Sequence, residues 1–148
     1  MYALVKDNAV VKYPYTFTDC IRDNPKTSFP KSLSESVFAE FGVLPVREVA
    51  QPSVDHTKNI VWGTPVFNNG WEQVWVVEDA TAEQIAERTS SQASSVRSER
   101  NRLLEASDWT QLADSSADKS SWASYRQQLR DITKQAGFPF SVTWPVAP

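Results

Sequence analysis

Few residues of this chain have the type and spacing that catalysis requires. The only histidine, His56, follows Asp55 in a polar segment, and neighbouring side chains in a loop rarely point at a common target. No serine or cysteine stands in a context that marks it as the nucleophile for such a base. The single cysteine, Cys20, is expected to be a partly buried small hydrophobe and not a reactive thiol. We therefore expect that the protein is not an enzyme.

The composition also argues against metal, cofactor and nucleic-acid binding. One histidine and one cysteine cannot supply a structural zinc site, and the four glycines form no phosphate-cradling motif. The formal net charge of −3 lacks the surplus of clustered Lys and Arg that nucleic acid requires. No apolar run approaches the roughly 20 residues that span a bilayer, and no signal peptide is visible. We expect a cytoplasmic protein that binds no membrane.

The residue types that stand out are those that anchor protein–protein contacts. Three of the six tryptophans lie in the last third of the chain, together with two arginines spaced four residues apart. Trp, Tyr and Arg dominate the energetically important contacts of interfaces. We expect partner contacts from Trp109, Trp122, Tyr125, Arg126, Arg130, Trp144 and Pro145, and from Trp71 and Trp75 in the first half.

The elements that must position these residues indicate an α+β protein in three parts. Residues 1–79 are rich in β-branched and aromatic residues and predict a small antiparallel β domain. Residues 80–106 predict a long connecting helix, and residues 107–148 a short C-terminal helical module. A composition of 41% hydrophobic and 22% charged residues is that of a globular chain.

In the N-terminal part, residues 2–13 predict two short strands around a turn, and residues 34–41 a short helix. A further strand over 43–49 contains Pro45, which confines it to a sheet edge or makes Pro45 its start. An Asn-Asn-Gly turn at 68–70 predicts a hairpin between residues 59–67 and 71–77. In its second strand Trp71 and Trp75 share one face, which is either core or contact surface.

The long helix is expected from Thr81 to Glu105, with Thr81 and Gln84 as a capping box. Its apolar seam is thin, with Ala and Thr where a stable coiled coil has Leu and Ile. A connecting helix between two lobes and a coiled coil therefore both remain open.

The C-terminal helix has an aromatic and aliphatic stripe that can form a small core. Leu129 and Ile132 are expected to be core, whereas Trp109, Trp122 and Trp144 are either core or anchors. Arg126 and Arg130 repel each other at this spacing and need acids, their own or a partner's. Gly137 is expected just past the helix end. The stripe comprises Trp122, Tyr125, Leu129, Ile132 and Ala136, packing on Leu103, Leu104 and Leu112, and the internal acids are Asp108, Asp114 and Asp118.

Residues 95–148 closely resemble the C-terminal domain of phage tail assembly chaperone proteins. Four separated motifs occur in the expected order: Arg100-Asn-Arg-Leu-Leu, Ser107-Asp-Trp-Thr-Gln-Leu112, Trp122-x-x-Tyr-Arg-x-x-Leu-Arg130 and Gly137-Phe-Pro-x-x-Val-x-Trp-Pro145. The N-terminal half is similar to the front part of such proteins in Tyr2-Ala-Leu-Val-Lys, Val11-Lys-Tyr-Pro-Tyr15 and Asn24-Pro-x-x-Ser28-Phe-Pro30.

The resemblance implies a non-enzymatic chaperone, in the host cytoplasm during phage assembly, that binds a tail-fibre protein and assists its folding or trimerisation. The fibre partner is expected to be trimeric, so three copies of the chain on one fibre and single copies on each fibre chain are both open. The alternative is a virion subunit that stays on the mature tail fibre as an accessory or adaptor. An enzyme acting on host glycans is a distant third reading.

Overall fold

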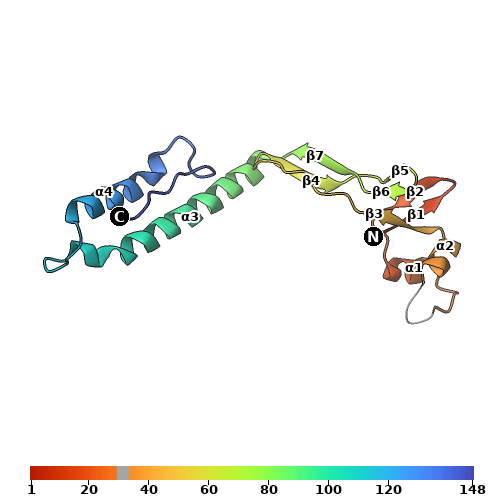
Figure 1. Cartoon of the computed structure of the whole chain (residues 1–148). Helices are drawn as coiled ribbons and strands as arrows, with labels where there is room; N and C mark the ends of the chain where they lie inside the picture. The colour runs from red at the N-terminus through yellow and green to blue at the C-terminus, as the bar shows by residue number, and fades with distance from the viewer. Residues whose placement is uncertain (30–33) are drawn as a thin grey trace. The chain divides into compact units, whose positions relative to one another are not determined.

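The computed structural model describes residues 1–29 and 34–148, and it divides into two compact units, residues 1–79 and residues 80–148. Figure 1 shows sheet and short helices in the first unit and helices in the second, which confirms the α+β class. Pro30, the last residue of the N-terminal motif that begins at Asn24, lies outside the described residues. The functional division of the second unit at residues 106 and 107 stays a prediction.

The first unit is built on a five-stranded sheet in the order β2-β1-β3-β6-β5. The predicted N-terminal hairpin is confirmed, because Asp7 and Asn8 adopt the positive φ angles of 50° and 60° that a tight turn needs. The strands are β1 (Tyr2–Lys6), β2 (Ala9–Lys12), β3 (Val43–Arg47), β5 (Val66–Phe67) and β6 (Trp71–Glu72).

The sheet is antiparallel apart from one parallel pair, β3 with β6. Pro45 lies in the middle of β3, neither at its start nor in an edge strand, so that expectation was wrong. The strand tolerates the proline because β6 pairs with β3 only at Val46 and Arg47. No ladder bond to β6 is therefore lost at residue 45.

Two short helices, α1 (Phe17–Asp23) and α2 (Glu35–Glu40), belong to the same unit. The predicted helix over 34–41 is confirmed: the Ser34 side chain caps the start of α2, and Gly42 follows it with a φ of 71°. The buried residues form two clusters, one of Ala3, Val5, Val46 and Trp71 and one of Tyr15, Cys20, Phe38 and Val43.

The predicted hairpin at 59–77 forms, but its second strand is not continuous. β5 and β6 pair across the Asn-Asn-Gly turn, whereas β4 (Lys58–Trp62) and β7 (Trp75–Asp79) form a separate two-stranded ribbon. Between the two parts residues 63–65 lie opposite only residues 73 and 74, so the register shifts by one residue and the pairing is interrupted. Trp71 therefore lies in the sheet core and Trp75 in the ribbon, so the prediction of one continuous second strand was wrong, whereas the shared face of the two tryptophans stays a prediction.

The second unit consists of two packed helices and a C-terminal tail. The predicted capping box of Thr81 and Gln84 starts α3 (Ala82–Ala106), and α3 packs against α4 (Lys119–Asp131). Short 3₁₀ turns cover Asp108–Gln111 and Ile132–Lys134. The buried hydrophobic residues of this unit include Ala93, Val96, Tyr125, Leu129 and Ile132.

Three expectations for the C-terminal core were wrong. Leu112 is 58% exposed and not packed in the core. Ala136 is exposed because α4 gives way to a 3₁₀ turn at Ile132, which breaks the helical spacing. Gly137 lies beyond that turn and does not cap α4. Glycine is required at this position because a Cβ would lie 2.0 Å from the Ser141 carbonyl oxygen.

Candidate partner-binding surface

An aromatic row leads from the core of the second unit to its surface. Tyr125 is buried, Trp122 is half-buried, and Trp109 is 53% exposed. The Trp122 ring meets Tyr125 edge-on with 5.6 Å between centroids and lies 5.9 Å from the Trp109 ring. Leu112, three residues after Trp109, is exposed as well. The outer end of the row, Trp109, Leu112 and Trp122, is called the aromatic patch below.

The backbone around the aromatic patch is fixed by Arg126, which is buried. Its Nη1 donates to the Leu104 carbonyl at 2.6 Å and to Ser107 Oγ at 2.7 Å. Its Nη2 donates to Asp108 Oδ1 at 2.7 Å. The guanidinium thus binds the C-terminal end of α3 and the 3₁₀ turn that carries Trp109, where a cation also suits the helix dipole.

The two arginines of α4 have different surroundings. Arg126 pairs with Asp108, an acid of its own chain. Of the two alternatives for this arginine, pairing with an internal acid or with an acid of a partner, the structure shows the first. Arg130 is exposed, and in the part of the chain that the structure describes it makes no ion pair. It is therefore the arginine that remains accessible to an acidic group of a partner.

The start of α4 is capped by Asp118. Its carboxylate accepts from the backbone and hydroxyl groups of Ser120 and Ser121, and these hydrogen bonds lower the Asp118 pKa to about 2. Asp118 was one of the acids considered for the arginines, but the structure assigns it to the helix cap.

The C-terminal tail is held by Gln135, whose side chain acts like a strand partner. Its Nε2 donates to the Thr143 carbonyl at 2.8 Å, and its Oε1 accepts from the Thr143 amide at 2.7 Å. Trp144 and Pro145 are half-buried and line a surface hollow of about 480 Å³ beside α4. Trp144 also lines a second hollow of about 510 Å³ beside α3.

The nine residues predicted to contact a partner thus fall into separate groups. Trp109, Trp122, Tyr125 and Arg126 come together, with Arg130 one turn further along α4, while Trp144 and Pro145 form the tail. Trp71 is buried in the sheet of the first unit, and Trp75 donates from Nε1 to the Val49 carbonyl at 2.9 Å. The contact of each with a partner stays a prediction.

Sequence reasoning missed Leu112 and Gln135. Leu112 was assigned to the core because a leucine near a helical stripe usually packs on it. Two residues later Asp114 begins a polar run that could have marked the end of the packed segment. Gln135 gave no signal, because a side chain that binds a backbone eight residues away has no local pattern.

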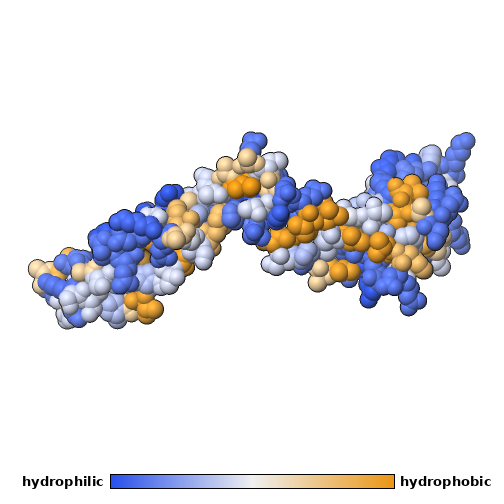
Figure 2. All heavy atoms as spheres, turned by 90° about the horizontal axis from the view of Figure 1, so that it is seen from above, coloured by the Kyte–Doolittle hydropathy of each residue, from blue (hydrophilic) through white to orange (hydrophobic). Residues whose placement is uncertain are grey.

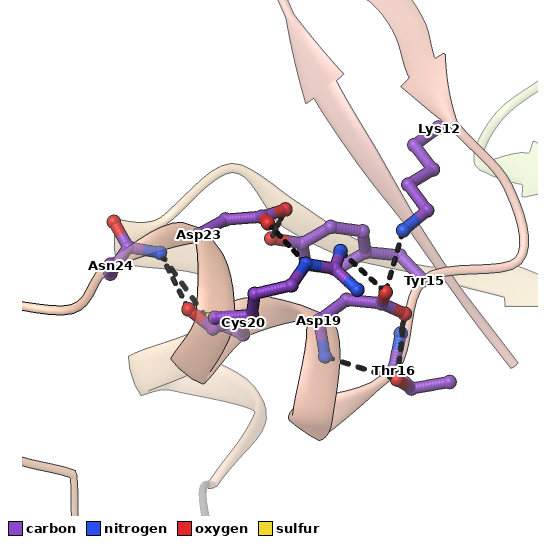
Figure 3. A network of polar contacts seen from close by, with 8 residues as sticks. Lys12, Tyr15, Thr16, Asp19, Cys20, Asp23 and Asn24 are labelled. Atoms are coloured by element: carbon purple, nitrogen blue, oxygen red, sulfur yellow. Dashed lines mark hydrogen bonds and ion pairs between the residues drawn. The ribbon is translucent and has the colours of Figure 1, made fainter.

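The clearest polar network of the first unit surrounds the start of α1 (Figure 3). Asp19 accepts from Lys12 and from Thr16, and these bonds hold its pKa well below the usual range. The Tyr15 hydroxyl donates to Asp23, and burial and that bond raise the Tyr15 pKa to about 12. Burial likewise raises the pKa of the Cys20 thiol, which opposes thiolate chemistry. The network joins β2 to α1.

Within residues 1–29 and 34–148 no three or more His, Cys, Asp or Glu side chains gather as metal ligands do. No helix of those residues combines the length and hydrophobicity needed to cross a bilayer.

Comparison with known proteins gives one match. The family described as phage tail assembly chaperone protein matches residues 93–148, which confirms the resemblance of the C-terminal segment. This segment includes the aromatic patch, Arg126 and the C-terminal tail. Neither the curated proteins nor the solved structures contain a match to the chain.

Proposed function

Because residues 93–148 match the phage tail assembly chaperone family, which supports a role in tail assembly, we propose that the chain binds the tail-fibre polypeptide and assists its folding or trimerisation. The observation that carries the proposal is the aromatic patch. Trp109 is more than half exposed, yet it is held in place by Trp122 and by the Arg126 network. Rigid exposed aromatic side chains are typical of interface anchors.

The chemistry of the patch suits an incompletely folded β-rich client. Such chains expose apolar strands that aggregate unless they are covered. The aromatic patch offers exposed apolar area, and exposed Arg130, further along α4, offers a cation for orientation. We infer that the patch covers client surface during assembly, without a catalytic step.

Co-expression with the tail-fibre protein of the same phage tests this proposal. Trp109→Ala is expected to lower the yield of soluble, trimeric fibre about tenfold, the effect of losing one anchor of roughly 1–2 kcal/mol. Val11→Ala is the matched control, because Val11 is an equally exposed apolar residue in the first unit. Equal fibre yields from wild type, Trp109→Ala and Val11→Ala would contradict the proposal.

The protein composition of purified particles distinguishes a transient chaperone from a virion subunit that stays on the fibre. A chaperone that leaves after assembly is expected to be absent from mature virions when they are analysed by quantitative mass spectrometry. Amounts equal to those of the fibre protein would show that the chain stays bound as an accessory subunit.

A further inference from the structure

The β4–β7 ribbon of the first unit exposes large apolar side chains on both of its faces. Its register places Trp62, Trp75 and Val77 on one face and Val61 and Val76 on the other. Val76 is 38% exposed and Val77 47% exposed, and Figure 2 shows hydrophobic surface along the ribbon. Two-stranded ribbons are marginally stable in water. A further strand is therefore expected to pair with the β4–β7 ribbon.

The outer edge of β7 has unpaired backbone groups. The Gly63 amide donates to the Val74 carbonyl at 2.8 Å, and bonded pairs alternate along an antiparallel ladder. Val76 and Glu78 therefore face β4, whereas the amides of Val77 and Asp79 point to the opposite side. Among the described residues no strand pairs with that side of β7.

This edge lacks the features that keep edge strands from pairing with other chains. Proteins block such edges with lysine, proline or a bulge. β7 reads Trp75-Val-Val-Glu-Asp79, and its pairing with β4 is regular over all five residues. Its charges lie at one end only. Trp75 already bonds the Val49 carbonyl through its indole Nε1, so Val76 and Val77 form the uncharged part of the edge that is open to strand addition.

The charges at that end indicate what kind of strand fits. Asp79 is paired with Lys58. Glu78, on the face of Val76, has no ion-pair partner within the described part of the chain. A strand that pairs with β7 and carries Lys or Arg beside Glu78 would complement this charge, while an acidic strand would be repelled.

We propose that the outer edge of β7 binds an extended strand of the tail-fibre polypeptide, with apolar residues beside Val76 and Val77 and a basic residue beside Glu78. The inference rests on the proposed function, because it states how the same client is held. A second copy of the chain fits less well. A second copy related to the first by a two-fold axis would cover either one edge or one face of the ribbon, and the other apolar face would stay exposed. A longer β-rich client can cover both.

Val77→Pro tests the edge directly. Proline at residue 77 removes only the amide that points outward and leaves the bonds to β4 intact. Val77→Thr is the matched control, since it keeps that amide and a β-branched side chain. We expect the affinity of the full chain for co-purified fibre protein to fall about tenfold for Val77→Pro, as for one lost hydrogen bond in a buried ladder, and to change little for Val77→Thr. Glu78→Lys is expected to weaken binding about fivefold by placing like charges side by side.

Hydrogen exchange of the wild-type complex provides a second measurement that needs no variant. The amides of Val77 and Asp79 are expected to gain protection when fibre protein is bound, whereas those of Val76 and Glu78 are protected already. If Val77→Pro binds fibre as wild type does and Val77 stays unprotected, the inference is overturned and the proposed function stands. If wild type does not bind fibre at all, both are overturned. Self-association of the wild type that Val77→Pro abolishes would assign the strand to a second copy and also overturn the inference.

Discussion

Arg126 is the residue on which the geometry of the aromatic patch depends. Its guanidinium satisfies a carbonyl at the end of α3, the Ser107 hydroxyl and the Asp108 carboxylate at once. Lysine keeps the charge but lacks the planar fork that makes these bonds together. Arg126→Lys is expected to lower the free energy of unfolding of the second unit by about 2 kcal/mol, because buried acceptors lose their donors.

Urea unfolding followed by tryptophan fluorescence measures this change. The matched control is Arg130→Lys, at the exposed arginine four residues later, which is expected to shift the free energy of unfolding by less than about 0.5 kcal/mol. Equal effects of the two substitutions would show that the Arg126 network adds nothing that a surface arginine does not.

Asp118 makes the stability of α4 depend on pH. Hydrogen bonds from Ser120 and Ser121 lower its pKa to about 2 from a usual value of 3.8. A lowered folded-state pKa stabilises the native state above the unfolded-state value, and this stabilisation is lost as the pH falls toward 2. The stability difference between wild type and Asp118→Ala is therefore expected to be largest above pH 4 and to shrink toward pH 2.

Thermal unfolding followed by circular dichroism at pH 5 and pH 2 tests the cap. Comparison of each variant with wild type at the same pH removes the effect of the other carboxylates. Asp114→Ala is the control, since Asp114 accepts no hydrogen bond from the described residues. A difference for Asp118→Ala that stays constant with pH would rule out the proposed role of the ionised cap.

At the scale of the elements, local signals in the sequence predicted most boundaries. The Asp7-Asn8 turn, the short helix over 34–41 and the Thr81–Gln84 capping box each depend on residues close to one another in the sequence. The single strand over 71–77 was wrong because the pairing is interrupted by one extra residue in 63–65, which lies across the hairpin. Long-range pairing, including the parallel contact of β3 with β6, leaves no comparable local pattern.

The candidate site shows the same limit. Helical spacing identified Trp122, Tyr125, Leu129 and Ile132 as one stripe, and the structure buries the last three. Helical spacing could not predict that Arg126, on the neighbouring stripe, is buried. Its hydrogen-bond partners Leu104 and Ser107 lie at the C-terminal end of a different helix, α3. Exposure of Trp109 and Leu112 likewise follows from the 3₁₀ turn after α3, whose direction depends on that contact.

The C-terminal tail is an element without regular structure, and its position depends on Gln135. Gln135→Ala removes both bonds to the Thr143 backbone. Hydrogen exchange of the Thr143 amide is expected to speed up about tenfold, as for the loss of roughly 1–2 kcal/mol of local stability. Gln128→Ala is the matched control, because Gln128 lines the same hollow without bonding the tail. Unchanged exchange at Thr143 in Gln135→Ala would show that the tail is held by Trp144 and Pro145 alone.

The turn before the tail requires glycine at residue 137. A Cβ at this position would lie 2.0 Å from the Ser141 carbonyl oxygen, which is backbone and cannot rotate away. Gly137→Ala is expected to destabilise the second unit by about 1–3 kcal/mol through this overlap. Ala136→Ser, at the exposed neighbour, is the control. A midpoint of urea unfolding equal to that of wild type would mean that the turn accommodates the methyl group.

At the scale of the whole molecule, the chain has two separate sets of buried residues. Val43, in the core cluster of residues 1–79, is completely buried, and so is Leu129 in residues 80–148. Compact units with their own cores unfold as separate cooperative units. Leu129→Ala is expected to lower the stability of the second unit by about 2–5 kcal/mol, while Val43→Ala lowers that of the first.

Residue-resolved hydrogen exchange of the full-length chain under increasing urea separates the two units. For Leu129→Ala, the amides of α3 and α4 are expected to lose protection at lower urea, whereas those of β1 and β3 keep their wild-type midpoint. Val43→Ala should give the reverse pattern, so each variant is the control for the other. If either substitution shifted all amides equally, the chain would unfold as one cooperative body. The binding sites proposed on the aromatic patch and on β7 could then not be varied independently, because loss of either core would remove both.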